Sequence, residues 1–268
     1  MPPAHATWTT APKAGVDWRA RGSGIRVGGH RGASATAPEN TWAAFEQAVH
    51  EGADYTETDI RRTADGQLVI LHDATVDRTT NGRGPVSAMT LASLGELDAG
   101  AWFGDGFRSQ RIPEFRALLR WIEARPGFGA ALEVKASGVG AEVAEAAWAS
   151  SARDRLAIYA FDPEEIRAAK AVRPEMPCVL LLRLDDDPNT TLAEIEACGA
   201  DGADVPWQWA APDLHARMRE RGFLVGGGSA SGDEAAEILI ATGVDMIDTD
   251  SPGAMLAAVK ALADRPAR

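Results

Sequence analysis

Short apolar runs alternate with longer stretches of helical character along most of the chain. Eight runs rich in apolar and β-branched residues predict strands, over residues 25–30, 54–61, 131–135, 156–161, 178–183, 201–205, 223–227 and 244–249. The stretches between them predict helices, over residues 38–52, 113–127, 140–151, 163–172, 190–198, 211–221, 232–242 and 253–264. Strict alternation of strands and helices is typical of a parallel sheet. Eight repeats in about 250 residues predict a closed (β/α)8 barrel, the TIM-barrel fold, with a doubly wound open sheet as the alternative.

The segment TETDIRRTADGQLVILHD places two carboxylates before a turn and a histidine after it. The Asp-Gly pair at positions 65 and 66 lies between two strand-like runs, which predicts a two-residue hairpin. In that register Asp59 lies directly opposite His72, and Glu57 shares their face of the sheet. The hairpin is therefore expected to gather three polar groups at one place.

The returning limb of this hairpin runs antiparallel to its own strand and leads into residues 73–112, which are rich in Gly, Arg, Thr and aromatic residues. A loop of this length in a compact domain is usually functional. Because it follows the second strand, we expect this small insertion to cover the active-site face as a lid or binding loop. Residues 1–24 are expected to form an irregular segment on the surface, and residues 25–268 a single barrel domain.

The composition restricts the class of partner. The chain has 27 Lys and Arg against 39 Asp and Glu, a formal net charge of -12. This charge argues against nonspecific binding to nucleic acid or to anionic membranes. Cys178 and Cys198 are interpreted as free thiols that are buried or half-buried. No run resembles a signal peptide or a membrane span, so we expect a cytoplasmic protein without stable membrane association.

Polar residues recur at the carboxyl ends of the predicted strands, where barrel enzymes carry their catalytic groups. Three of them, Glu57, Asp59 and Glu133, are carboxylates that converge near one point. Such a group must raise its pKa values or bind a cation, and oxygen ligands suit Mg²⁺ or Ca²⁺ better than Zn²⁺. The alternative is an ion-pair network. Its cations would be Arg31, Arg61 and Lys135.

Two of the five histidines, His30 and His72, lie at these strand ends. Imidazole has an ordinary pKa of roughly 6.5 and suits general acid–base catalysis. Arg31 and Lys135 supply the fixed positive charge that the nonbridging oxygens of a phosphodiester require. The other three histidines are interpreted as structural or without function: His5, His50 and His215.

The motifs GGHRGAS, PENT, ETD, DGQLVILHD, VDRTTNGRG, LEVK and GVDMIDTDSP together resemble the glycerophosphodiester phosphodiesterase family over about residues 25–255. The resemblance implies a (β/α)8 barrel with an insertion after strand two. It also implies metal-dependent hydrolysis of a small glycerophosphodiester to glycerol 3-phosphate and an alcohol. The resemblance implies that His30 and His72 are the acid–base pair. It implies that one divalent ion, Mg²⁺ or Ca²⁺, is bound by Glu57, Asp59 and Glu133. It also implies that Arg31 and Lys135 bind the phosphate. All seven are present, which argues against a non-catalytic binding module.

One departure concerns the substrate pocket. The family commonly carries Trp-Thr-Val-Asn on strand seven, where this chain has LVGGGSAS at 224–231. Gly226 to Gly228 would open space or let backbone N–H groups approach an anion. Trp207 and Trp209 would supply a replacement wall or pack as structural residues. The alternative function is therefore a phosphodiesterase of the same superfamily that acts on a lipid or another non-glycerol phosphodiester, with AGAWFGDGF (99–107) as its apolar loop.

Overall fold

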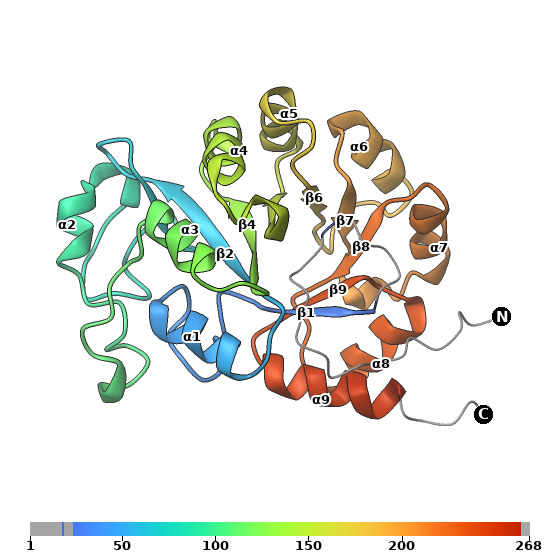
Figure 1. Cartoon of the computed structure of the whole chain (residues 1–268), viewed down its shortest axis with the longest axis horizontal. Helices are drawn as coiled ribbons and strands as arrows, with labels where there is room; N and C mark the ends of the chain where they lie inside the picture. Colours follow the sequence, from blue (N-terminus) through green and yellow to red (C-terminus); the bar gives the residue numbers. More distant parts are fainter. Residues whose placement is uncertain (1–17, 19–23, 264–268) are drawn as a thin grey trace.

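The computed structural model describes Trp18 and residues 24–263, which form a closed barrel (Figure 1). Its eight parallel strands are β1 (Arg26–Gly29), β2 (Tyr55–Arg62), β4 (Gly129–Val134), β5 (Leu156–Ala160), β6 (Cys178–Leu181), β7 (Gly202–Asp204), β8 (Leu224–Gly227) and β9 (Met246–Thr249). The strand order is β1-β9-β8-β7-β6-β5-β4-β2, and β1 also pairs with β2, which closes the ring. The (β/α)8 prediction is confirmed and the open-sheet alternative is wrong.

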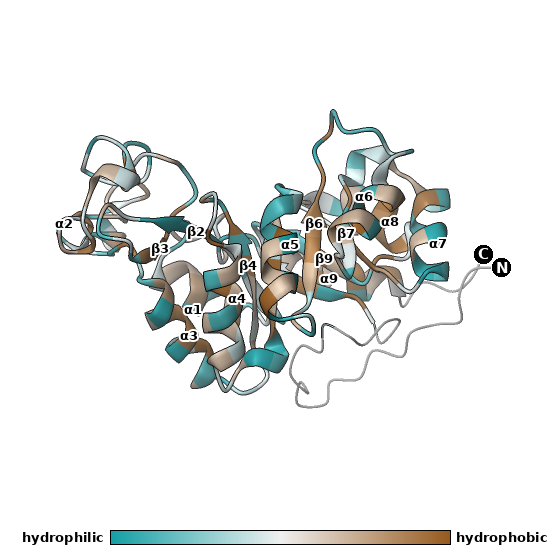
Figure 2. Cartoon of the chain, turned by 90° about the horizontal axis from the view of Figure 1, so that it is seen from above, coloured by the Kyte–Doolittle hydropathy of each residue, from teal (hydrophilic) through white to brown (hydrophobic). Residues whose placement is uncertain are grey.

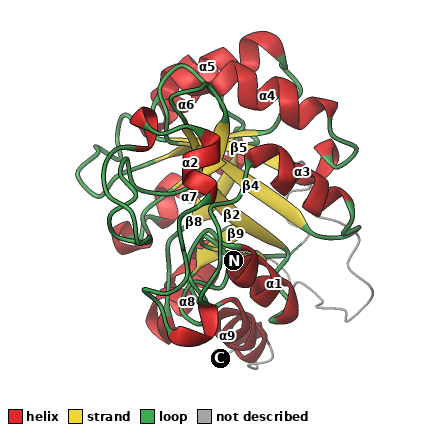
Figure 3. Cartoon of the chain, turned by 90° about the vertical axis from the view of Figure 1, so that its left-hand side faces the viewer, coloured by secondary structure: helices red, strands yellow, loops and turns green. Residues whose placement is uncertain are grey.

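In the described part of the chain, eight helices follow the eight barrel strands in alternation. They lie around the outside of the barrel (Figure 3). They are α1 (Trp42–His50), α3 (Phe115–Glu123), α4 (Gly140–Ala149), α5 (Pro163–Val172), α6 (Thr191–Cys198), α7 (Pro212–Glu220), α8 (Gly232–Thr242) and α9 (Pro252–Ala263). The helix α3 buries Phe115, Leu118, Leu119 and Ile122, the spacing of one helical face. The helix predicted over 38–52 begins later, because Thr41 caps it by accepting the backbone N–H of Ala44.

The hairpin after β2 differs from its prediction by one residue. Its returning limb, β3 (Leu68–Ile70), pairs Ile60 with Ile70, so Asp59 lies opposite Leu71 and not His72. The loop has three residues, 64–66, and ends at Gly66 with a positive φ of 78°. A three-residue loop with glycine in the left-handed conformation is the second common way to close a hairpin around Asp-Gly. The predicted two-residue turn is therefore wrong.

Residues 73–112 form a lobe beside the barrel (Figures 1 and 2). They contain η1 (Val86–Ala88), α2 (Leu91–Gly95) and η2 (Asp105–Phe107). The lobe has a small core of its own, made of Val69, Leu71, Val76, Val86, Leu94, Ala99 and Ile112. None of residues 73–112 lines the cavity described below. The expectation that this insertion covers the active-site face is therefore not supported, because its apolar residues pack on one another at the side of the barrel.

The barrel interior is closed by an aromatic residue from the N-terminal segment. Trp18 is 1% exposed, and its ring lies 4.8 Å from that of Tyr55 and 6.0 Å from that of Tyr159. For Trp18 the expected surface position is wrong, because its indole fills the apolar interior. The other residues of 1–23 lie outside the described part of the chain.

Two smaller predictions can also be compared with the structure. Cys178 and Cys198 are free and buried, as expected. Across residues 24–263, no helix combines the length and the apolar character needed to cross a membrane.

Candidate active site

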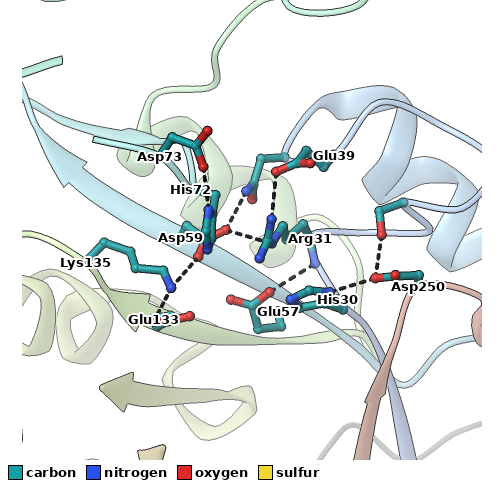
Figure 4. Close-up of polar contacts among 12 residues, drawn as sticks. His30, Arg31, Glu39, Glu57, Asp59, His72, Asp73, Glu133, Lys135 and Asp250 are labelled. Atoms are coloured by element: carbon teal, nitrogen blue, oxygen red, sulfur yellow. Dashed lines mark hydrogen bonds and ion pairs between the residues drawn. The ribbon is translucent and has the colours of Figure 1, made fainter. Parts of the chain in front are cut away.

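A cavity of about 260 Å³ opens at the carboxyl ends of the barrel strands. Figure 4 shows the polar contacts among the charged and histidine side chains around it. Six of the seven predicted site residues line it: His30, Arg31, Glu57, His72, Glu133 and Lys135. The seventh, Asp59, is fully buried and contacts Lys135 and Arg31. His72 reaches the cavity although the predicted register was wrong, because β3 ends at Ile70 and the chain turns before His72. The structure therefore brings all seven residues together.

Glu57, Asp59 and Glu133 form a compact acidic cluster. Each offers a carboxylate oxygen within 4.8 Å of the others, and all three residues are buried. Burial, reinforced by Asp59 and Glu133, raises the pKa of Glu57 well above its ordinary value. Burial and Asp59 raise the pKa of Glu133 to about 7. For Asp59 burial acts in the same direction, but Lys135 and Arg31 outweigh it and hold the pKa below its usual range.

Two cations partly neutralise this cluster. Lys135 Nζ lies 2.6 Å from Glu133 Oε1 and 3.4 Å from Asp59 Oδ1. Arg31 Nε lies 3.4 Å from Asp59 Oδ2, and the backbone N–H of Arg31 donates to Glu57 Oε2 at 3.0 Å. The ion-pair alternative is thus right for Arg31 and Lys135. It is wrong for Arg61, whose guanidinium donates to the carbonyl of His72.

The cluster nevertheless has capacity for a metal ion. Glu57 Oε1 is buried and has no hydrogen-bond partner among the described residues. An anionic oxygen in this state is costly unless a cation binds it. All the donors are carboxylate oxygens, the set that Mg²⁺ and Ca²⁺ prefer. The residues present therefore fit a divalent ion.

His30 is held by a carboxylate near the end of the chain. Its Nδ1 lies 2.6 Å from Asp250 Oδ1, which also accepts the Ser34 hydroxyl at 2.8 Å. The hydrogen bond with His30 is the main cause of the lowered pKa of Asp250. Because Nδ1 is engaged, Nε2 is the ring nitrogen of His30 that remains available.

His72 has a similar partner with a different charge environment. Its Nδ1 lies 2.7 Å from Asp73 Oδ1, and Arg78 donates to both oxygens of Asp73 at 2.7 and 3.0 Å. Burial lowers the pKa of His72. Asp73 is therefore neutralised by an arginine that is hydrogen-bonded to it. Among the described residues, the side chain of Asp250 has hydrogen bonds with His30 and Ser34, and Arg31 acts on it only through its electrostatic field.

The loop between β1 and α1 contributes further contacts to the acidic cluster. It contains the PENT motif, for which the sequence alone indicated no role. Asn40 Nδ2 donates to Asp59 Oδ2 at 2.6 Å, and Glu39 bridges Arg31 and Arg78. Arg31 and Asn40 both have positive φ angles, 57° and 55°. This uncommon backbone conformation aims one N–H and one side-chain amide at the acidic cluster.

The glycine run at the end of β8 does not open empty space. A Cβ at Gly226 would lie 2.7 Å from Asp204 Oδ2, so a carboxylate fills that volume. The backbone N–H of Gly228 does approach an anion, since it donates to Asp204 Oδ1 at 2.9 Å. Trp207 and Trp209, in η4 (Trp207–Trp209), pack against the main core and do not line the cavity. The replacement-wall interpretation of these tryptophans is wrong.

Comparison with known proteins identifies relatives over most of the chain. The sequence model of the "Glycerophosphoryl diester phosphodiesterase family" matches residues 30–254. The glycerophosphodiester phosphodiesterase of Caldanaerobacter subterraneus subsp. tengcongensis is 33% identical over 238 residues, 86% of this chain and 96% of that protein. YhdW of Bacillus subtilis is 39% identical over 156 residues, 58% of this chain and 64% of YhdW, less than two thirds of its length. The structure of an Oleispira antarctica phosphodiesterase in complex with the product sn-glycerol-3-phosphate has a TM-score of 0.81 and 27% identity, and the match covers 88% of this chain and 96% of that one.

Proposed function

This chain belongs to the glycerophosphoryl diester phosphodiesterase family, and on that premise we propose that it hydrolyses small glycerophosphodiesters to glycerol 3-phosphate and an alcohol by metal-assisted acid–base catalysis. The observation that carries the proposal is one cavity that holds a buried carboxylate cluster, two cations and two histidines. Each histidine has its Nδ1 bound to an aspartate.

Glu57, Asp59 and Glu133 would hold one divalent ion, Mg²⁺ or Ca²⁺. When bound, the ion would supply positive charge to a phosphate oxygen and offset the negative charge that develops during hydrolysis. Arg31 and Lys135 lie beside these carboxylates and would bind the remaining nonbridging oxygens.

The charge around each histidine supports different roles for the two rings. In the described part of the chain no arginine forms an ion pair with Asp250, and Arg31 is the weakest cause of its lowered pKa. The negative charge of Asp250 would therefore stabilise the imidazolium that forms when His30 Nε2 accepts a proton from the attacking hydroxyl or water. Arg78 compensates the charge of Asp73. Burial lowers the pKa of His72, so its imidazolium gives up a proton more readily than an ordinary imidazolium, and the proton goes to the oxygen of the leaving alcohol. We therefore assign His30 as base and His72 as acid.

A lipid phosphodiester is the second candidate substrate, favoured by two exposed apolar side chains. Trp102 in the lobe is 42% exposed, and Leu184 in the loop after β6 is 60% exposed. The net charge of -12 opposes contact with anionic membranes. We therefore favour a water-soluble substrate in the cytoplasm, and co-sedimentation with phosphatidylglycerol vesicles would overturn that preference.

The proposed reaction can be tested by phosphorus NMR of chelator-washed protein with glycerophosphocholine. Glycerol 3-phosphate should form only after Mg²⁺ or Ca²⁺ is added. Cleavage of an aryl phosphodiester without cleavage of glycerophosphocholine would move the substrate to the second candidate. Failure with both substrates would refute the proposed function.

A further inference from the structure

One arginine side chain connects the lobe to two groups of the active site. Arg78 lies in the lobe, and its guanidinium donates to the carboxylates of Asp73 and Glu39. Asp73 is hydrogen-bonded with His72, the proposed acid, and Glu39 with Arg31, a proposed phosphate ligand (Figure 4). A continuous chain of hydrogen bonds thus runs from His72 to Arg31 through a residue that does not line the cavity.

The guanidinium of Arg78 forms paired hydrogen bonds with each of the two carboxylates. Its Nε and Nη2 lie 2.7 and 3.0 Å from the two oxygens of Asp73. Its Nη1 and Nη2 lie 2.6 and 2.8 Å from the two oxygens of Glu39. Exposed ion pairs usually contribute little, but paired hydrogen bonds joined in a network are the exception. All three nitrogens of the guanidinium are therefore used to hold these two carboxylates.

The lobe holds the backbone of Arg78 in place. Val76 is fully buried in the small core of the lobe, and Thr79, the residue after Arg78, is 4% exposed. The backbone N–H of Val76 donates to the carbonyl of Gly84 at 3.0 Å. The Arg78 side chain is 45% exposed, yet it is anchored by the lobe at one end and by two carboxylates at the other. The lobe can therefore act on the site through this one side chain.

Each carboxylate shares one oxygen between Arg78 and a residue of the site. Glu39 Oε1 accepts from Arg78 Nη2 at 2.8 Å and from Arg31 Nη1 at 2.9 Å. Asp73 Oδ1 lies 3.0 Å from Arg78 Nη2 and 2.7 Å from His72 Nδ1. A carboxylate held by two partners has fewer accessible rotamers, so it fixes the group it contacts more firmly. Loss of Arg78 would let both carboxylates rotate.

We propose that Arg78 and Glu39 form a positioning unit that fixes the ring of His72 and the guanidinium of Arg31 for catalysis. This inference rests on the proposed function, and it gives the lobe a role in the reaction. Neither Arg78 nor Glu39 lines the cavity, so the unit acts on the substrate only through His72 and Arg31.

Arg78→Ala tests this unit, because it leaves an exposed notch that a free guanidinium ion can enter. The kcat for the diester that the parent cleaves should fall about a hundredfold, since an error of about 1 Å in the position of a catalytic group has an effect of that size. KM should change far less, because Arg31 keeps its contact with Asp59. Millimolar guanidinium should raise the kcat of the variant about tenfold, and urea, which has nearly the same shape but no charge, should not.

Two further variants and a control complete this series. Arg78→Lys keeps the charge but cannot form both pairs of hydrogen bonds, so it should melt like the parent and be nearly as impaired as Arg78→Ala. Glu39→Gln should lower kcat by a similar factor, and the double variant Arg78→Ala/Glu39→Gln should lose no more than the worse single variant. The matched control is Arg83→Ala in the same lobe, where Arg83 is 85% exposed and lies 3.7 Å from Asp77. It should keep the kcat of the parent.

Failure of the positioning unit can be distinguished from failure of the proposed reaction. An active parent whose Arg78→Ala and Arg78→Lys variants keep its kcat would overturn the unit alone. A loss of kcat that guanidinium does not restore, or losses that add in the double variant, would indicate a purely structural role for Arg78 and overturn the unit as well. A metal-loaded parent that cleaves neither glycerophosphocholine nor an aryl phosphodiester would refute both the reaction and the unit.

Discussion

Replacing Glu133 by Gln should have opposite effects on the protein with and without a divalent ion. Burial and Asp59 raise the pKa of Glu133 to about 7, above its ordinary value near 4.5. Because the folded pKa is higher than the unfolded one, the folded state binds this proton more tightly, and its stability is lost as the pH rises through about 7. At about 1.4 kcal/mol per pKa unit, the loss is about 3 kcal/mol at pH 8. Gln keeps the shape without the charge, so the metal-free variant should melt about 6–12 °C above the parent.

Adding the ion should reverse this order. A ligand that binds only the folded state stabilises it by about 4 kcal/mol at a thousandfold excess over its Kd. The parent gains this stabilisation in full, whereas the variant lacks one of the three anionic ligands and gains less. Thermal unfolding followed by circular dichroism, after a chelator wash and again with saturating Mg²⁺ or Ca²⁺, measures both effects. At acidic pH, where Glu133 is protonated in the folded protein, the difference without metal should shrink.

The matched control is Glu220→Gln, because Glu220 is exposed on α7. It should change neither the melting temperature nor the gain from the ion. A metal-free Glu133→Gln protein that melts below the parent at pH 8 would refute the electrostatic reasoning. A parent whose melting temperature ignores both ions would refute the metal site.

Three further measurements address single side chains. Asp250→Asn should lower kcat about a hundredfold with little change in KM or melting temperature, because the change removes the charge that supports protonated His30. Stopped assays across a range of substrate concentrations measure kcat and KM. A change in both kcat and KM would indicate a structural role for Asp250. Burial lowers the pKa of His215 to about 4, so the folded protein resists protonation of this side chain. The free energy of unfolding should therefore fall by about 3 kcal/mol as the pH drops from about 6.5 to 4. Urea unfolding at both pH values should show a smaller fall for His215→Leu. His72→Ala should abolish turnover and leave metal affinity nearly intact, whereas Glu57→Ala should weaken metal affinity. Calorimetry measures metal binding by the two variants. If both bind the ion as tightly as the parent, Glu57 is not a metal ligand.

The periodicity of the sequence was sufficient to predict the barrel, because each strand is an apolar run and each helix has a buried face. It was not sufficient to determine the hairpin register. Asp-Gly closes both two-residue and three-residue loops, and the choice depends on where Gly66 adopts its positive φ. Nor could it place Trp18, since a lone tryptophan in an irregular segment carries no period, and only the assembled barrel offers an apolar interior for it.

Polar residues at the strand ends were sufficient to predict the seven candidate site residues. The carboxylates that hold the two histidines could not be predicted in the same way. Asp250 lies 220 positions from His30, a pairing that no local pattern reports. Asp73 lies next to His72 in the sequence, so adjacency was a usable signal there. Asp204 was hidden, because its carboxylate fills space left by a glycine on another strand.

The pairing of β1 with β9 has a consequence for how the chain acquires activity. These strands come from opposite ends of the described sequence. Their pairing is one of the two that β1 needs for the closed ring, and it brings Asp250 to His30. Contacts of such long sequence separation form only after the intervening chain is in place. During synthesis the carboxylate cluster on β2 and β4 can assemble early, but a ribosome-bound chain that lacks β9 has neither a closed ring nor an oriented His30. We therefore expect activity to appear only after the last strand has emerged, and partial chains that lack β9 to be inactive.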